Sequence, residues 1–240
     1  MSKAACFVTS PTVERKFQYA SETFKKYNPD WKIERIEVNW DGFSFLSEYA
    51  KSNVSDYIRF KSIKSLLENY EKVVYLDCDT ETFGPFDIVS SLLCDHNLII
   101  TPHVCRPPVG ADLLAMGEYN AGFLGAAKNN EVIEFLDWLE HKTVQHLKST
   151  GTDPIVTGQS WLRMAPCFLA HCLILRNSGI NVAYWNIEEF MDSGKELKMF
   201  HYSGLIKATP LDEMSCHSDK KIPDFMVERF KNYRNKVFGT

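Results

Sequence analysis

The sequence predicts an α/β fold whose mostly parallel, doubly wound central sheet is flanked by helices. In the first half of the chain, short apolar runs of strand length alternate with longer segments in which apolar residues recur at helical spacing. Such alternation is typical of parallel sheets joined by crossover helices. The chain has 240 residues, 45% of them hydrophobic and 24% charged, which suits one large domain, and no repeat, low-complexity tract or linker divides it.

The predicted elements follow one another in a regular order. In the N-terminal half we expect strands over 4–9, 33–38, 73–76 and 97–101, and helices over 13–27 and 55–70. In the C-terminal half we expect strands over 118–127, 181–186 and 199–202, and helices over 130–147 and 159–172. Proline marks two boundaries, because Ser10-Pro11 ends the first strand and Asn28-Pro29 ends the first helix.

Charge and cysteine content narrow the class of protein. The net charge is −4, so no basic excess indicates nucleic acid, and we expect none as a partner. The seven cysteines are irregularly spaced without a Cys-x-x-Cys pair, which indicates neither a disulfide framework nor a zinc site. The N-terminus lacks the apolar run of a signal peptide, and no segment has the length of a membrane span. These features predict a cytoplasmic protein.

Two carboxylates follow the most apolar strand. The run from Val73 to Leu76 is typical of a buried strand, and Asp77 and Asp79 come directly after it. Ligands bind at the carboxyl ends of strands in open α/β sheets. Two carboxylates there suit Mg²⁺ or Mn²⁺ bridging to a phosphate, although acidic residues also end strands as turn formers.

A second motif, His-x-x-Gly-x-x-Lys, follows the expected strand at 199–202. His201 offers a nitrogen as third ligand to a metal held by the two aspartates. Gly204 would let the backbone approach a phosphate, and Lys207 would place a charge on it. Alone, the motif equally fits a strand-end histidine, a turn glycine and a solvated lysine.

Three further polar residues stand in suggestive places. Asn120 precedes Gly122 in a strand, where a β-bulge is the plainer interpretation. Gln159 follows Gly158 at an expected helix start. Arg59 lies on the helix before the apolar strand, where a surface charge is the plainer interpretation.

Taken together, these motifs resemble glycosyltransferase family 8, a group of GT-A glycosyltransferases. The order is Phe-Val-Thr near the N-terminus, Tyr-x-Arg, Asp-x-Asp after a strand, Asn-x-Gly, Gln, and His-x-x-Gly-x-x-Lys, over about residues 5 to 207. The resemblance extends to bacterial cell-surface glycan transferases of the lipopolysaccharide or capsule type. It implies a GT-A fold with a Rossmann-like sheet: a catalytic domain at 1–215, with a nucleotide-sugar half at about 1–100 and an acceptor half at about 101–215, and a basic segment at 216–240.

The resemblance also implies a reaction: transfer of a hexose from a nucleotide sugar, usually UDP-linked, to a saccharide acceptor with retention, assisted by Mn²⁺ or Mg²⁺. Asp77, Asp79 and His201 would hold the metal, and Asp79 would also touch the ribose. The other implied roles are a nucleotide pocket lined by Phe7, Val8 and Thr9, sugar or diphosphate contacts from Arg59 and Asn120, a diphosphate contact from Lys207, and Gln159 near the anomeric carbon.

The chain departs from the family pattern before Gln159. Relatives usually carry Asp there, and this chain has Gly158. The change removes an acceptor for sugar hydroxyls, and Asp153 is a nearby carboxylate that could replace it. Ala208-Thr209-Pro210 also differs from the Pro-Trp usual after the lysine.

The C-terminal segment 220–240 interleaves basic and aromatic residues. Two interpretations are open: a helix resting on an anionic membrane surface at the inner face, near a lipid-linked acceptor, or a helix packed on the domain with a solvated basic face.

Three other functions compete with glycosyl transfer. A haloacid-dehalogenase-type phosphatase also uses Asp-x-Asp after a strand, but normally on the first strand and with a small pair next, where this chain has Thr80-Glu81. A nucleotidyltransferase shares the metal logic but leaves the segment from His201 to Lys207 unexplained. A catalytically silent nucleotide-sugar-binding or scaffold protein stays open because of Gly158.

Overall fold

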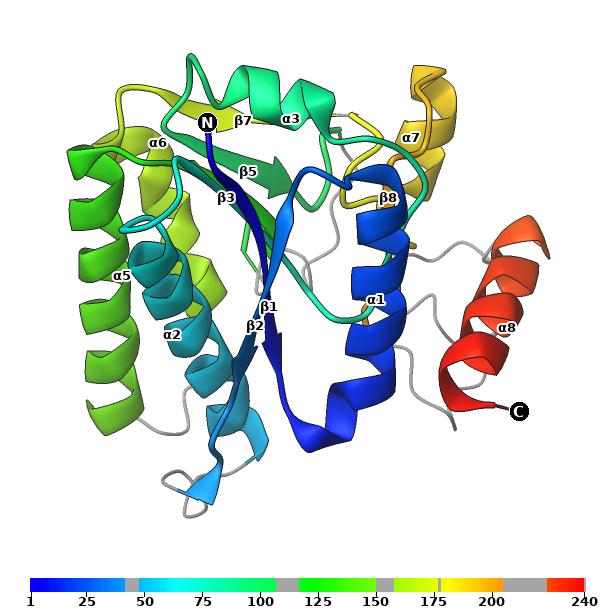
Figure 1. The fold of residues 1–240 in the computed structure, drawn as a ribbon, viewed down its shortest axis with the longest axis horizontal. Coiled ribbons are helices and arrows are strands. Elements are labelled where there is room, and N and C mark those ends of the chain that lie inside the picture. The colour runs from blue at the N-terminus through cyan, green and yellow to red at the C-terminus, as the bar shows by residue number, and fades with distance from the viewer. Residues whose placement is uncertain (42–47, 107–116, 150–157, 177, 205–223, 240) are drawn as a thin grey trace.

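A central six-stranded sheet with helices on both faces forms the body of the protein (Figure 1). The structure is a computed structural model, and it describes residues 1–41, 48–106, 117–149, 158–176, 178–204 and 224–239. The strands of this sheet are β1 (Lys3–Thr9), β2 (Lys32–Glu37), β3 (Lys72–Leu76), β5 (Leu98–Pro102), β6 (Tyr119–Ala127) and β7 (Cys172–Ile174).

The sheet has the order β2-β1-β3-β6-β5-β7. β1 runs parallel to β2 and β3, and β5 runs parallel to β7, whereas β6 is antiparallel to both of its neighbours, β3 and β5. Five strands therefore share one direction and only β6 opposes them. This arrangement confirms the predicted α/β class with a mostly parallel sheet.

The helices form two layers. The helical elements are η1 (Pro11–Val13), α1 (Glu14–Tyr27), α2 (Glu48–Leu66), α3 (Asp87–Leu92), α5 (Asn130–Ser149), η3 (Gly158–Met164), α6 (Ala165–Phe168), α7 (Ile187–Ser193) and α8 (Asp224–Phe238). α2, α5, η3 and α6 contribute to the cluster on one face of the sheet, and α1 and α3 to the cluster on the other. Figure 1 shows α2 and α5 side by side, with α1 across the sheet and α8 beyond it.

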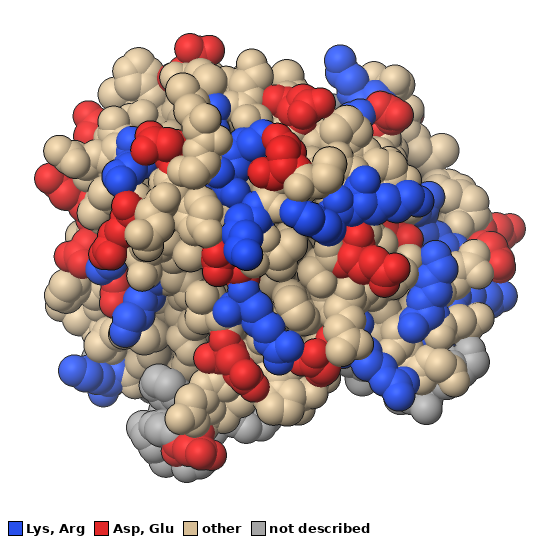
Figure 2. Space-filling view, viewed as in Figure 1, with Lys and Arg blue, Asp and Glu red and all other residues tan. Residues whose placement is uncertain are grey.

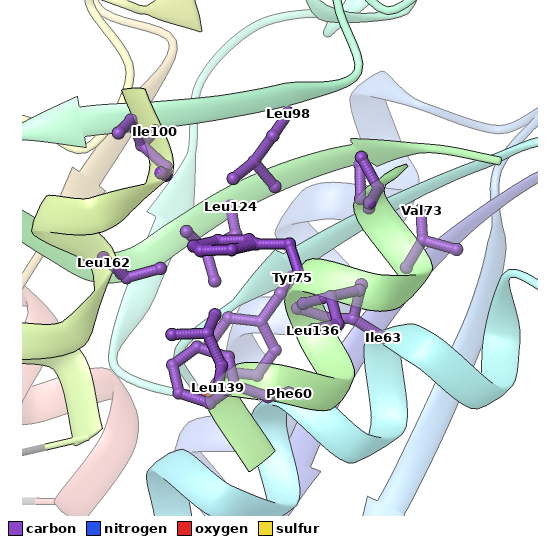
Figure 3. Close-up of a cluster of buried hydrophobic side chains, with 14 of the residues drawn as sticks. Phe60, Ile63, Val73, Tyr75, Leu98, Ile100, Leu124, Leu136, Leu139 and Leu162 are labelled. Carbon is purple, nitrogen blue, oxygen red and sulfur yellow. The ribbon is translucent and has the colours of Figure 1, made fainter. Parts of the chain in front are cut away.

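Side chains of β3 point alternately to the two faces of the sheet and pack in both hydrophobic clusters. Val73 and Tyr75 point into the α2–α5 cluster, whereas Val74 and Leu76 point into the α1–α3 cluster. Figure 3 shows the first of these clusters, in which Phe60 of α2 lies beside Tyr75. All five β3 residues are buried, as expected for a central strand covered on both faces, so the residues just after β3 are held on a rigid element.

A small two-stranded sheet sits at the end of β3. β4 (Thr80–Thr82) pairs antiparallel with β8 (Met199–His201). The helix α8 covers this ribbon, because its buried residues Met226, Phe230 and Tyr233 join a cluster with Phe200 and Tyr202. The apolar face of α8 thus packs on the domain, which is the second of the two interpretations of this segment. A membrane contact through its basic residues stays a prediction.

Most predicted elements are confirmed, with two exceptions. The helix expected over 159–172 is a 3₁₀ segment and one short α-helical turn, because Pro166 lies within it and lacks the N–H that a helix interior needs. The strand expected over 181–186 is an isolated bridge between Val182 and Phe200. The strands β4 and β7 and the helices α3 and α7 had no prediction.

The surface is mixed in charge. On the face shown in Figure 2, basic and acidic side chains are interspersed, in keeping with the small net charge. Every helix in the described part of the chain is too short or too polar to cross a membrane.

Candidate active site

The turn between β3 and β4 carries the two aspartates. Asp77 follows β3 directly, and Cys78 and Asp79 form the turn that leads into β4. The Cys78 thiol donates to the Val8 carbonyl at 3.2 Å. Backbone hydrogen bonds hold the pair from both sides: Asp77 N donates to the Gly122 carbonyl at 3.0 Å, and Tyr202 N donates to the Asp79 carbonyl at 2.7 Å.

His201 meets the aspartates across the β4–β8 ribbon. In this ribbon Thr80 pairs with His201, which places the imidazole beside the carboxylate of the preceding residue, Asp79. His201 Nε2 lies 3.1 Å from Asp79 Oδ1 and 3.6 Å from Asp77 Oδ2. The ligating atoms of the three residues all lie within 4.8 Å of one another. The predicted proximity of two motifs more than 100 residues apart is therefore confirmed.

A directed chain of hydrogen bonds sets the tautomer of His201. The Gly117 carbonyl can only accept, so His103 Nδ1 donates to it at 2.7 Å and His103 Nε2 accepts from Asn120 Nδ2 at 3.1 Å. Asn120 Oδ1 then accepts from Asn181 Nδ2 at 2.9 Å. Asn181 Oδ1 accepts from His201 Nδ1 at 3.0 Å. The proton on Nδ1 leaves the Nε2 lone pair of a neutral His201 aimed at the aspartates, as metal-binding histidines require.

Gly122 makes room for this imidazole. A Cβ on Gly122 would lie 2.3 Å from His201 Cε1 and 2.4 Å from His201 Nδ1. Any side chain there would displace the ring. The register of β5 and β6 shifts here, because Ile100 pairs with Leu124 and Thr101 with Asn120, so Gly122 lies at the expected irregularity of the strand. It also allows the close approach of a side chain from β8.

Electrostatics in the cluster favour a bound cation. Burial would raise the pKa of Asp79, but the His201 charge lowers it to about 2. Burial would lower the pKa of His201, but the charges of Asp79 and Asp77 raise it. The two carboxylates thus favour positive charge in the space between the three groups, and two carboxylates with one imidazole are a donor set suited to Mn²⁺. The residues fit such a metal.

Arg59 links the metal cluster to α2. Its Nη2 donates to Asp77 Oδ1 at 3.1 Å, Nη1 donates to Asp56, and the guanidinium carbon lies 4.7 Å from the centre of the Tyr75 ring. Its Nε is buried and has no hydrogen-bond partner among the described residues. Arg59 is 7% exposed, so the expectation of a surface charge is wrong.

A pocket of about 280 Å³ opens beside the cluster. Its wall includes Val8 and Thr9 at the end of β1, Trp40, and Lys16 of α1, whose Nζ lies 3.9 Å from Asp79 Oδ2. Asp77 and Asp79 form its edge together with Arg59. The pocket therefore combines two aromatic rings, Trp40 and Tyr75, with two cations and two carboxylates.

Two of the other predicted site residues lie inside the fold. The side chain of Phe7 packs in the core against Phe17 and Phe24, so any nucleotide contact would come from its backbone. Asn120 is 7% exposed, and its amide is engaged by the hydrogen-bond chain to His201.

Of the remaining predicted residues, the structure describes Gln159 and Gly204. Gln159 Oε1 accepts from Ala121 N at 2.8 Å, next to Asn120 on β6. Gly204 has φ +75°, and a Cβ there would meet nothing within 4 Å, so its backbone lies in open space. Lys207 and Asp153 lie outside the described residues.

Two site residues had no prediction. Asp56 and Asn181 are both buried and both bind predicted site residues. An aspartate within a helix and an asparagine two residues after Gly179 are typical of a solvated surface and a turn, so no local pattern distinguishes them.

Comparisons with known proteins assign the fold. No protein-family model matches the chain, and no curated protein matches its sequence. Among solved structures, the galactosyltransferase LgtC bound to donor and acceptor sugar analogues matches with a TM-score of 0.61 and 15% identity, covering 98% of this chain and 96% of that chain. A glycosyltransferase involved in glycosylation of the major capsid of PBCV-1 has a TM-score of 0.59 and 11% identity, covering 86% and 95%. The glycosyltransferase GlyE of Streptococcus pneumoniae TIGR4 has 0.59 and 16%, covering 100% of this chain and 64% of that chain.

The chain has the GT-A glycosyltransferase fold. At these identities the comparisons speak for the fold alone. The Asp77–Asp79–His201 cluster lies at the carboxyl end of β3, the edge of an open α/β sheet at which ligands bind.

Proposed function

We propose that the chain is a metal-dependent glycosyltransferase that moves a hexose from a UDP-linked sugar to a glycan or lipid-linked saccharide, with retention of configuration. The observation that carries the proposal is the Asp77–Asp79–His201 cluster at the edge of the pocket in a GT-A fold.

Two parts of the pocket wall would bind two parts of the donor. Trp40 and Val8 offer apolar surface to the base, on which an aromatic ring can stack. The diphosphate would lie over the metal cluster, where Lys16 and Arg59 add positive charge. A contact from Lys207 remains a prediction.

The residues suit the charge changes of the reaction. A bound divalent cation would act as a Lewis acid toward the leaving nucleoside diphosphate. Arg59, held by Asp77 and Asp56, presents a fixed positive charge beside that position and needs little reorganisation as negative charge grows. Gln159 is held on β6 through Ala121 and would lie at the sugar end of the donor.

The test is Mn²⁺-dependent hydrolysis of a panel of UDP-hexoses, measured as released UDP. We expect turnover of at least one donor, and a loss of about 10²–10³-fold with Asp79→Asn, the size of effect seen when one group that stabilises transition-state charge is removed. Asp95→Asn is the matched control, because Asp95 is an exposed carboxylate in the turn after α3.

Two outcomes would contradict the proposal. Tight UDP binding without turnover of any donor would make the chain a nucleotide-binding protein. Release of UTP from a UDP-sugar and pyrophosphate would make it a nucleotidyltransferase.

A further inference from the structure

Asp56 joins two parts of the site that the sequence leaves unconnected. It lies in α2, one residue after the pocket-lining Ser55, and is 6% exposed. One carboxylate oxygen, Oδ1, accepts from Arg59 Nη1, and the other, Oδ2, accepts from Gln159 N at 2.8 Å. Arg59 continues to Asp77. Asp56 thus spans the distance between the metal cluster and η3.

The Asp56 side chain packs directly against Gly158. A Cβ on Gly158 would lie 2.3 Å from Asp56 Cβ and 2.8 Å from Asp56 Oδ2. The backbone φ of Gly158 is outside the left-handed region, so the conformation of the chain does not require glycine there. Glycine is required only because the Asp56 side chain fills the adjoining space. The Asp56 carboxylate on α2 and the absence of a side chain at Gly158 on η3 therefore depend on each other.

Joining two helical segments through a buried carboxylate has a high desolvation cost. A buried carboxylate costs free energy unless it is paired and hydrogen-bonded, and an apolar pair would join α2 to η3 as firmly. The Asp56 charge is matched by Arg59, whose other bond reaches the candidate metal ligand Asp77. The family resemblance implies that Arg59 contacts the sugar or diphosphate and that Gln159 lies near the anomeric carbon. This juxtaposition favours a role in the reaction over a role in packing.

We propose that Asp56 is a positioning residue for sugar transfer: it holds Arg59 on the diphosphate side and Gln159 on the sugar side in one fixed relation, and Gly158 gives it room. The inference rests on the proposed function and deepens it. Asp56 acts through its two partners and need not touch the donor.

The first test is Asp56→Asn, which keeps the shape of the side chain and removes its charge. We expect kcat for Mn²⁺-dependent UDP-sugar hydrolysis to fall by about 10²-fold, the effect of a misplacement of about 1 Å in a reacting group. The dissociation constant of UDP with Mn²⁺, measured by calorimetry, should change much less than kcat, because Asp77, Asp79 and His201 are untouched and only the Arg59 contact with the diphosphate is displaced. Asp137→Asn is the matched control. Asp137, in α5, pairs with Lys64 of α2, the helix that also carries Asp56, and it is half exposed, so kcat should be unchanged.

The second test separates positioning from folding by moving the carboxylate. Gly158→Ala should lower kcat like Asp56→Asn, because its Cβ displaces Asp56 without changing any charge. The exchanged double variant Asp56→Gly with Gly158→Asp returns a carboxylate to the same space from η3. It should recover at least tenfold of the kcat lost in Asp56→Gly. Circular dichroism melting curves identify any variant that fails to fold. If a single variant does not fold, kcat of the exchanged double variant decides whether a carboxylate in this space supports turnover.

Each outcome assigns a cause. The positioning role would be overturned if kcat of Asp56→Asn were within twofold of the wild-type value, or if kcat of the exchanged double variant were no higher than that of Asp56→Gly. Either result would leave the proposed function standing. A wild-type protein that turns over no donor would overturn the proposed function and this inference with it.

Discussion

Replacing Asn181 with glycine should weaken metal binding without touching any metal ligand. Asn181 has φ +58°, a left-handed conformation that glycine adopts without strain and alanine does not. Asn181→Gly therefore removes the amide and leaves the backbone in place. His201 then loses the acceptor that fixes the proton on Nδ1, and its Nε2 lone pair is no longer held toward Asp77 and Asp79.

The magnitude follows from the bonds that Asn181 makes. Its amide accepts from His201 Nδ1 at 3.0 Å and donates to Thr101 Oγ1 at 2.7 Å and to Asn120 Oδ1 at 2.9 Å. At about 1 kcal/mol for each net hydrogen bond, the metal-free protein should lose about 3 kcal/mol of unfolding free energy. Loss of a partner that orients a metal-binding histidine typically costs about 10–100-fold in metal affinity, which is about 1.4–2.7 kcal/mol.

Two measurements keep stability and affinity apart. Urea unfolding of the metal-free protein gives the first, and calorimetric titration of Mn²⁺ at saturating UDP gives the second. Thr101→Val is the matched control, because it removes a bond at the other end of the same amide and leaves the contact with His201 intact. It should lower stability but not Mn²⁺ affinity. Equal Mn²⁺ affinity in Asn181→Gly and wild type would refute the tautomer argument.

The remaining predictions concern buried hydroxyls and pH. Tyr233 Oη is buried without a hydrogen-bond partner among the described residues, whereas Tyr202 Oη donates to Glu81 Oε2 at 2.6 Å. Urea unfolding should therefore show Tyr233→Phe to be neutral or stabilising, and Tyr202→Phe to cost about 1.5–3 kcal/mol; equal losses would contradict the assignment. The raised pKa of His201 stabilises the metal-free fold fully below its ordinary value of 6.5, and this contribution is lost as pH rises through the folded pKa. The pKa of Asp79, lowered to about 2, adds stability above 3.8 that is lost as pH falls. Metal-free unfolding should therefore be hardest between these limits, and Mn²⁺ affinity should rise with pH as the metal displaces the His201 proton; affinity independent of pH from 5 to 8, in roughly the range where histidine titrates, would contradict it.

Sequence predicted the elements in which burial has a strong period. The apolar run of β3 favours a strand and the spacing of apolar residues in α1 and α5 favours helices, and the structure confirms these elements. The run from Val182 to Trp185 was harder, because it has strand composition but follows a left-handed Asn181. Its shape is set by contacts with β8 and not by its own preference.

For the site, the sequence predicted the three candidate metal ligands but not the residues that hydrogen-bond to them and to their neighbours. Asp77, Asp79 and His201 stand in motifs that metal chemistry explains, so their proximity was predictable. Asn181 and Asp56 act through partners 20 and 103 positions away, at His201 and Gln159. No local spacing encodes such pairs, because they arise only when the sheet brings η3, β6 and β8 to one edge.

The departure at Gly158 takes on another meaning in the folded chain. Along the sequence, it removes a carboxylate beside Gln159 and keeps open a catalytically silent protein. In the structure, a carboxylate lies against Gly158 all the same, supplied by Asp56 from α2, 103 positions before the Gln159 N–H that it accepts from. A silent protein would not need this buried charge, since an apolar contact between α2 and η3 would avoid the desolvation cost that raises the pKa of Asp56 against the opposing effect of Arg59. The presence of Gly158 therefore argues for a rearranged site, and its activity is what the exchange of Asp56 and Gly158 measures.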